Sequence, residues 1–177
     1  MALAHIALGS NLPSLTGHPD ATLAAALPQL ASIGRITARS RLYSTAPVGL
    51  SNQPRFLNAV VVLDTPLAPR TLLTALLFIE RLFGRDRTVA VPNGPRTLDL
   101  DILLYGDLIH SEPGLEIPHP RLAQRAFVLV PLAEIAPDLR DPRSGLTAAQ
   151  LLANLAPANS PSDPAVTPVQ SPLWPSA

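Results

Sequence analysis

The chain has 177 residues, the size of one ordinary domain with a hydrophobic core. Its 13 basic and 13 acidic residues cancel, so no charge excess exists to bind a nucleic-acid backbone or a membrane surface. The absence of cysteine excludes disulfides and thiolate metal sites, and the absence of lysine excludes a P-loop and Schiff-base chemistry. No secretory signal and no apolar run of about 18 residues is present, so we expect a cytoplasmic protein.

The first half of the chain predicts strands that alternate with helices. Strands show as short apolar or alternating runs that end at turn residues, and helices show apolar residues at a spacing of three and four. On these patterns we expect a strand over 2–8, a helix over 20–33 with Asp20 as its N-cap, strands over 35–43 and 56–64, and a helix over 66–84.

The second half begins with a polar loop and becomes more helical. We expect a loop over 85–97, a strand over 98–104, a short hairpin around 107–110, and helices over 120–132 and 147–156. Residues 157–177 contain six prolines and little to bury, which predicts a disordered tail. Removal of residues 159–177 should then leave activity and melting temperature nearly unchanged.

The order strand, helix, two strands, helix, strand predicts the fold class. It is typical of an α+β domain with a ferredoxin-like βαββαβ core, an antiparallel-rich sheet and additional C-terminal helices. The predicted domain covers residues 1–156, and the tail covers 157–177.

The stretch "TLDLDILLY" places Asp99 and Asp101 in an otherwise apolar strand. Side chains two residues apart point to the same face of a strand, so the two carboxylates stand about 6.6–7 Å apart at Cα. Adjacent carboxylates repel each other unless a cation lies between them, and carboxylates with substrate phosphates suit Mg²⁺. A solvated sheet face and a pair of arginine salt bridges remain alternatives.

The surroundings of the two aspartates favour a metal-bound polyphosphate. Arginine binds phosphate through two parallel hydrogen bonds, and several arginines flank the pair: Arg85, Arg87, Arg96, Arg121 and Arg125. Four other residues admit a ligand contact or an ordinary structural role, namely the polar residues His119 and Asn58 and the aromatic residues Phe56 and Phe127.

The segment "GPRTLDLDILLYG" (94–106) closely resembles the signature of the 6-hydroxymethyl-7,8-dihydropterin pyrophosphokinase family, the ATP-dependent enzymes of folate synthesis. Further segments resemble the family in the same order and spacing: "IALGSNL" (6–12), "YSTAPVG" (43–49), "NQPRFLNAVV" (52–61), "GRDR" (84–87) and "IPHPRLAQRAFVLVPLAEIAPD" (117–138). The resemblance covers about residues 2–156.

The resemblance implies a role for each matching residue. Asp99 and Asp101 would hold two Mg²⁺ ions, and Arg85 and Arg87 would close over the triphosphate as catalytic residues. The nucleotide side would be formed by Glu80, Arg96, Ile102, His119 and Arg125. The pterin would lie between Phe56 and Phe127, and its hydrogen-bonding edge would be read by Asn58 and the segment around Thr45, Pro47 and Val48.

The implied reaction transfers the β,γ-pyrophosphate of ATP to the hydroxymethyl oxygen of the pterin and releases AMP. Such a reaction depends on positioning and charge neutralisation, so no general base is assigned. The loop over 85–97 would act as a lid, and a monomer with ATP and a pterin as its partners is expected. The family often has a basic and an aromatic residue before "GPR", where this chain has Pro92 and Asn93, which affects ATP affinity and lid closure.

Two other functions compete with the pyrophosphokinase. A noncatalytic pterin- or nucleotide-binding module would not need both aspartates and both lid arginines. A small RNA-binding α+β domain would need exposed aromatics and basic charge, whereas aromatic residues make up 4% of this chain and its net charge is zero. An enzyme requires Asp99, Asp101, Arg85, Arg87 and Phe127 to converge on one cleft.

Overall fold

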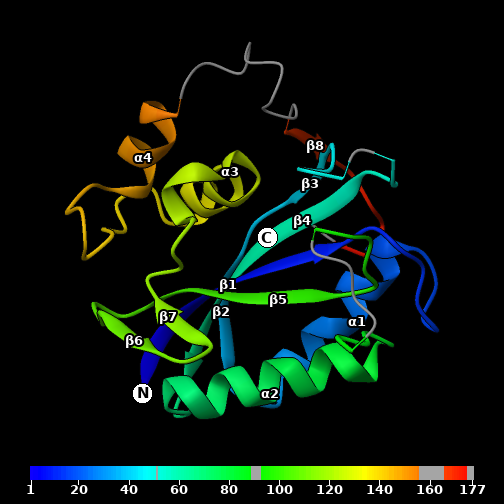
Figure 1. Ribbon diagram of the computed structural model, residues 1–177, viewed down its shortest axis with the longest axis horizontal. Coiled ribbons are helices and arrows are strands. Elements are labelled where there is room, and N and C mark those ends of the chain that lie inside the picture. The colour runs from blue at the N-terminus through cyan, green and yellow to red at the C-terminus, as the bar shows by residue number, and fades with distance from the viewer. Residues whose placement is uncertain (51, 89–92, 156–165, 175–177) are drawn as a thin grey trace.

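The computed structural model describes residues 1–50, 52–88, 93–155 and 166–174. In these residues the chain forms a mixed α+β fold, as predicted, with helices on both faces of an antiparallel sheet (Figure 1). The elements in chain order are β1 (Ala2–Ser10), α1 (Pro19–Ala31), β2 (Arg35–Arg39), β3 (Leu42–Thr45), β4 (Phe56–Thr65), α2 (Pro69–Leu82), β5 (Asp99–Tyr105), β6 (His110–Glu112), β7 (Leu115–Ile117), the 3₁₀ turn η1 (Leu122–Gln124), α3 (Ala126–Ile135), α4 (Ala148–Asn154) and β8 (Thr167–Val169).

Strand β1 lies between two other strands of the main sheet. It pairs antiparallel with β4 on one side and with β5 on the other. The full order is β5-β1-β4-β3-β8, and β2 also pairs with β4, beside β3. Strands β6 and β7 form a small separate hairpin. Because β1 is paired on both sides, residues of its carboxyl end lie between residues of β4 and β5.

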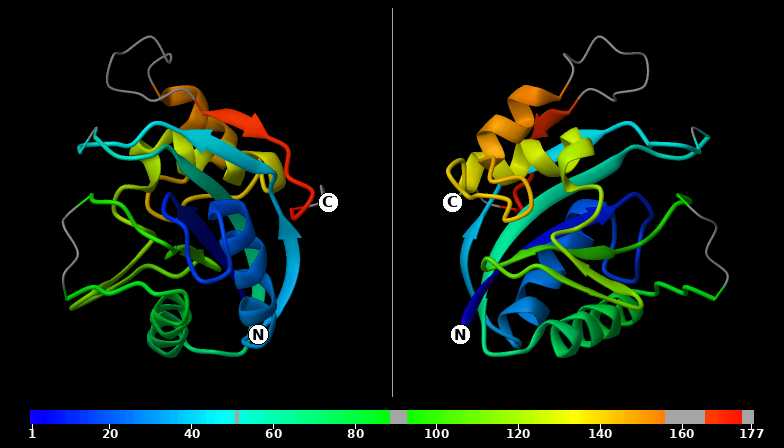
Figure 2. Two further views of the ribbon diagram at one scale, coloured as in Figure 1. Left: turned by 90° about the vertical axis from the view of Figure 1, so that its right-hand side faces the viewer. Right: turned by 60° about the vertical axis from the view of Figure 1, so that its left-hand side comes forward.

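The sheet separates two hydrophobic cores. Alternate residues of a strand point to opposite faces, so Ile6 and Leu8 pack with helices α1 and α2, whereas Ala7 contacts the core formed with α3 and α4. Figure 2 shows the two pairs of helices on opposite sides of the sheet. None of the helices in the described ranges is long and apolar enough to cross a membrane.

Several predicted elements have different boundaries. The hairpin expected around 107–110 is formed by β6 and β7, further along the chain, and α1 begins at Pro19 with His18, not Asp20, as its N-cap. The strand expected over 35–43 is broken into β2 and β3 at Ser40, whose backbone N–H donates to the Val60 carbonyl (2.9 Å) and whose hydroxyl accepts from the Val60 N–H (3.0 Å). The helix expected over 120–132 begins at Ala126 and is preceded by η1. Arg125 separates the two because its backbone is extended (φ −122°, ψ 101°).

The prediction of a disordered tail is wrong for residues 166–174. Thr167–Val169 form β8, which pairs with β3, and the side chain of Trp174 is only 4% exposed. The physical reason is that strand β3 has unpaired backbone groups on its outer side, with which β8 can pair. In addition, the single Trp of the chain buries its ring in the core formed with α1 and α2. The remaining tail residues, 157–165 and 175–177, lie outside the described residues.

Candidate active site

Three neighbouring strands place a row of functional side chains on one face of the sheet. Gly9 on β1 pairs with Asn58 on β4 and with Asp99 on β5, and two residues earlier Ala7 pairs with Asp101. A Cβ atom added to Gly9 would lie 3.3 Å from Asn58 Oδ1 and 3.8 Å from Asp99 Cβ. The small residues of β1 therefore leave a hollow between the amide and the carboxylates.

This hollow is the floor of a cleft that we call the central cleft. Its volume is about 360 Å³, including the part that is open to solvent. It lies between the sheet and the start of α3, and its lining comprises Ala7, Leu8, Gly9, Asn58, Ala59, Arg96, Asp99, Asp101, Arg125, Phe127 and Val128. Two carboxylates, two guanidinium groups, an amide and an aromatic ring thus surround one space.

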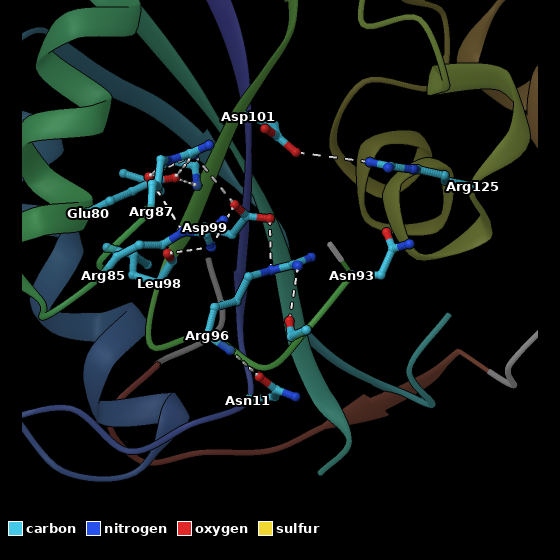
Figure 3. A network of polar contacts seen from close by, with 12 residues as sticks. Asn11, Glu80, Arg85, Arg87, Asn93, Arg96, Leu98, Asp99, Asp101 and Arg125 are labelled. Atoms are coloured by element: carbon cyan, nitrogen blue, oxygen red, sulfur yellow. Dashed lines mark hydrogen bonds and ion pairs between the residues drawn. The ribbon is translucent and has the colours of Figure 1, made fainter. Parts of the chain in front are cut away.

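Asp99 is surrounded by arginines. Its carboxylate lies 2.9 Å from Arg85 Nη1, 3.0 Å from Arg96 Nε and 3.9 Å from Arg87 Nη2 (Figure 3). The side chain of Asp99 is 16% exposed. The arginine salt bridges that the sequence left as an alternative are therefore present for this aspartate.

Asp101 is the more open carboxylate of the pair. Its side chain is 38% exposed, and Arg125 Nη1 lies 4.0 Å away, from the other side of the central cleft. Burial in the cleft and the neighbouring Asp99 raise the pKa of Asp101. A carboxylate without a close partner favours a bound cation, which would lower this pKa again.

Glu80 on α2 contacts two of the arginines that surround Asp99, namely Arg85 and Arg87. Its side chain is 1% exposed and accepts two hydrogen bonds from Arg87 (both 2.9 Å) and one from the Leu100 N–H (2.8 Å). Arg85 Nε lies 3.8 Å from the same carboxylate. Burial raises the pKa of Glu80, while the Leu100 N–H and the two arginines act in the opposite direction. One buried acid therefore joins helix α2, the loop arginines and strand β5.

Arg96 connects the cleft to the first turn of the chain. Its backbone N–H donates to Asn11 Oδ1 (2.8 Å), and its carbonyl accepts from the N–H groups of Asn11 (3.0 Å) and Leu12 (3.1 Å). Its guanidinium lies 4.8 Å from the centre of the Phe56 ring. The "GSN" turn and the "GPR" turn, far apart in the sequence, are thus held side by side (Figure 3).

The chain matches known proteins over most of its length. Residues 5–137 match the family model described as 7,8-dihydro-6-hydroxymethylpterin-pyrophosphokinase. A protein of Pseudomonas aeruginosa named 2-amino-4-hydroxy-6-hydroxymethyldihydropteridine pyrophosphokinase is 49% identical over 140 residues, which are 78% of this chain and 83% of the relative. The protein of the same name from Methylorubrum extorquens is 44% identical over 160 residues, 89% of this chain and 96% of the relative.

The chain belongs to the 7,8-dihydro-6-hydroxymethylpterin-pyrophosphokinase family.

A solved structure supports the fold of this pyrophosphokinase-family chain. The crystal structure of wild-type HPPK-DHPS from Plasmodium falciparum superimposes with a TM-score of 0.66 at 17% identity. The match covers 86% of this chain and 44% of that longer chain, so this chain spans less than half of its length. At this identity the comparison supports the fold alone.

The structure brings most of the predicted site residues of the pyrophosphokinase together. Of the residues implied by the family resemblance, six line the central cleft: Asn58, Arg96, Asp99, Asp101, Arg125 and Phe127. Arg85 and Arg87 join them through Asp99. Thr45 lies behind Asn58 and accepts a hydrogen bond from its amide nitrogen (2.7 Å). Of the five residues that an enzyme requires in one cleft, Asp99, Asp101 and Phe127 line it, and Arg85 and Arg87 lie beside it, in contact with Asp99.

Other predicted site residues of the pyrophosphokinase lie away from this cleft. Glu80 was expected on the nucleotide side, but its carboxylate contacts arginines and strand β5 instead. Ile102 has its side chain in the core with α1 and α2. Pro47 and Val48 lie on the loop that follows β3, and Val48 is 52% exposed. Phe56, the predicted partner of Phe127 around the pterin, is covered by Arg96.

His119 lies beside the arginines and is neutral at physiological pH. Its ring Nδ1 accepts a hydrogen bond from the Arg121 N–H (3.0 Å). Burial first, and then Arg125 and Arg121, lower its pKa from 6.5 to about 4. A neutral imidazole whose Nδ1 is an acceptor carries its proton on Nε2, so His119 can donate one hydrogen bond to an anionic ligand.

Sequence reasoning missed three residues of the site. Gly9 and Ala7 form the floor of the cleft, and Asn11 orients Arg96. The signal for all three was the "IALGSN" segment, which places small residues on one strand face and an amide at the following turn. Their roles depend on which strands lie beside β1, which a local pattern does not show.

Proposed function

We propose that this chain transfers the β,γ-pyrophosphate of ATP to the hydroxymethyl group of 6-hydroxymethyl-7,8-dihydropterin and releases AMP, a step of folate biosynthesis. Membership of the pyrophosphokinase family supports the reaction class. The observation that carries the proposal is the row of Asn58, Gly9 and Asp99 across three paired strands. This row places the Asn58 amide, which can form hydrogen bonds with a heterocycle, beside the Asp99 carboxylate, which can bind a metal–phosphate complex.

The two carboxylates fit Mg²⁺ that is bound together with substrate phosphates. In the described part of the chain, no three metal-binding side chains gather, so the protein supplies two hard oxygen ligand groups and not a closed cage. Such a set suits Mg²⁺, which commonly takes one or two carboxylates and completes its shell with phosphates and water. Bound there, Mg²⁺ would neutralise phosphate charge and make the hydroxymethyl group easier to deprotonate.

The pterin would enter over Gly9, where no side chain occupies the floor. Asn58 has one amide N–H fixed by Thr45, which orients the rest of its amide group. Phe127 lines the cleft and offers a ring face for the heterocycle. We assign Phe56 to the second ring face, which requires Arg96 to move from its place over that ring.

The arginines would act on the triphosphate. Arg85 and Arg96 contact Asp99 in this structure, and both must turn toward phosphate when ATP binds and the carboxylate takes a metal. Arg87 stays tied to Glu80 through two hydrogen bonds. We therefore assign Glu80 a positioning role, in which it acts through the arginines and does not touch ATP.

The chemical step needs alignment and charge compensation. The hydroxymethyl oxygen attacks the β-phosphorus and gives up its proton to water, while the bond from that phosphorus to the oxygen shared with the α-phosphate breaks and AMP leaves with that oxygen. Arg85, Arg87 and Arg125 would stabilise the charge that develops on the transferred and leaving phosphates. His119, neutral with its proton on Nε2, would donate to a phosphate or ribose oxygen of the nucleotide.

The test is whether the protein releases AMP from ATP and Mg²⁺ in the presence and in the absence of 6-hydroxymethyl-7,8-dihydropterin, with AMP measured by chromatography. We expect AMP in stoichiometric amount with the pterin that is consumed. AMP formation that does not depend on the pterin, or no AMP from folded protein that binds both ligands, would contradict the proposal, and the second outcome would favour a binding module. The monomeric state and the cytoplasmic location stay predictions for gel filtration and cell fractionation.

A further inference from the structure

The C-terminal segment 166–174 docks along the outer edge of the main sheet, beyond the residues that match the family model. Strand β8 pairs antiparallel with β3, with Thr167 opposite Ser44 and Val169 opposite Leu42. The Thr167 hydroxyl also donates to the Ser44 carbonyl (3.3 Å). Figure 2 shows β8 beside β3, at the side of the sheet away from β5. We call residues 166–174 the strap.

Trp174 anchors the strap in the main core. Its side chain is 4% exposed and packs in the cluster formed with α1 and α2. Its indole N–H donates to the Ser40 carbonyl (2.9 Å), and the Arg39 guanidinium lies 5.5 Å from the ring centre. A second tie is the Ser171 hydroxyl, which donates to the carboxylate of Asp20 at the start of α1 (2.8 Å).

The strap contacts both ends of β3. Just before β3, the Trp174 indole is bonded to Ser40, whose hydroxyl and N–H are bonded to Val60 on β4. At the other end, Thr167 pairs with Ser44, the residue before Thr45. Strand β3 has only four residues, so the strap supplies the pairing on its second side.

The end of β3 that the strap supports is the part that orients Asn58. Thr45 Oγ1 accepts the Asn58 amide at 2.7 Å, and both side chains are buried. A small shift of β3 relative to β4 would lengthen this hydrogen bond and release the amide. The acid pair and the arginines that contact Asp99 lie on the other side of β1, on β5 and the loop before it, so that β1, β4 and β3 separate them from β8.

We propose that the strap is a positioning element for the pterin side of the central cleft, with Trp174 as its anchor. It fixes β3, so that Thr45 holds Asn58 in the orientation that reads the pterin. This inference rests on the proposed function, because it assigns Asn58 to the pterin. It reverses the sequence-based expectation that removal of the tail is neutral.

The strap predicts an asymmetric effect on the two substrates. Trp174→Ala, and a chain that lacks residues 166–177, should raise the KM for the pterin by about tenfold, because small displacements of positioning groups have large effects. The KM for ATP should change by less than about twofold, since the nucleotide side is untouched. Trp174→Phe, which keeps an aromatic ring but not the N–H, should restore part of the loss. Leu173→Ala, at a neighbouring side chain that is 52% exposed, is the matched control.

A measurement on the unmodified chain covers the case in which these variants fail to fold. Because coupling between two sites is reciprocal, pterin binding should slow amide hydrogen exchange in residues 166–174, whereas ATP alone should not. The proposal would be overturned if both KM values rose equally or if neither changed. It would also be overturned if bound pterin did not alter amide hydrogen exchange in the strap. If the full chain releases no AMP and binds no pterin, the proposed function fails instead, so the two failures are distinguishable.

Discussion

The hydrogen bond between Asn58 and Thr45 makes a quantitative prediction. Thr45→Val keeps the shape of the side chain and removes the acceptor of a 2.7 Å hydrogen bond between two buried groups, which are 7% and 2% exposed. A buried donor that loses its partner costs about 1–3 kcal/mol, so the free energy of unfolding should fall by that amount. The freed amide should also raise the Kd for the pterin by about tenfold, equivalent to about 1.4 kcal/mol.

The assay combines urea denaturation with calorimetric titration of the pterin and of an ATP analogue. Thr37→Val is the matched control, because Thr37 on β2 is exposed and donates a longer hydrogen bond to the Val62 carbonyl (3.3 Å). That variant should change the free energy of unfolding by less than about 0.5 kcal/mol. The Kd for the ATP analogue should be the same in both variants.

A double-mutant cycle decides whether the hydrogen bond itself is responsible. Asn58→Ala and Thr45→Val should be non-additive in pterin binding by about 1 kcal/mol, because each removes the same interaction. Additive effects, or a Thr45→Val chain that binds pterin as tightly as the unmodified one, would refute the role given to Thr45.

Three further predictions concern the metal site, pH and the buried acid. Asp101→Ala should abolish Mg²⁺-dependent AMP release while circular dichroism shows an unchanged fold; full activity would end the metal assignment. Burial lowers the pKa of His5 from 6.5 to about 4. The unfolded chain therefore binds a proton at this histidine below about pH 6.5, whereas the folded chain binds it only below about pH 4. The free energy of unfolding should therefore fall by about 2 kcal/mol from pH 7.5 to pH 5 because of this residue, and His5→Leu should remove that part of the decline in urea titrations; an unchanged slope would contradict the assignment. Glu80→Gln should lower kcat at least about tenfold, because the arginines that Glu80 holds would be misplaced. Glu112→Gln, which removes an exposed ion pair with Arg70, should leave kcat unchanged. If the two variants have the same kcat, the positioning role of Glu80 is refuted.

The parts of the fold that depend on local periodicity were predictable from the sequence. The helix that became α2 follows from the spacing of Leu72, Leu76 and Ile79, which are all buried. Asp99 and Asp101 were expected on one strand face, and both line the central cleft. These features need only the geometry of a single element, which the order of residues determines.

The features that sequence reasoning missed depend on partners far along the chain. Ser40 ends a strand because of its bonds to Val60, and Trp174 docks on the carbonyl of Ser40, 134 residues away in the sequence. Gly9 becomes the cleft floor only because β4 and β5 flank β1 in one register. The sequence also indicated arginines near the acids, but which arginine pairs with which acid is a property of the folded loops.

In the proposed reaction, one cleft transfers a pyrophosphate unit, and not a single phosphate, to the pterin. Phosphorus NMR of a reaction that contains ATP, Mg²⁺ and 6-hydroxymethyl-7,8-dihydropterin tests it most directly. We expect a singlet for AMP and two coupled resonances for a pterin diphosphate, appearing together and in equal amounts. Signals of ADP with a pterin monophosphate, or ATP signals that stay unchanged beside folded protein, would contradict it.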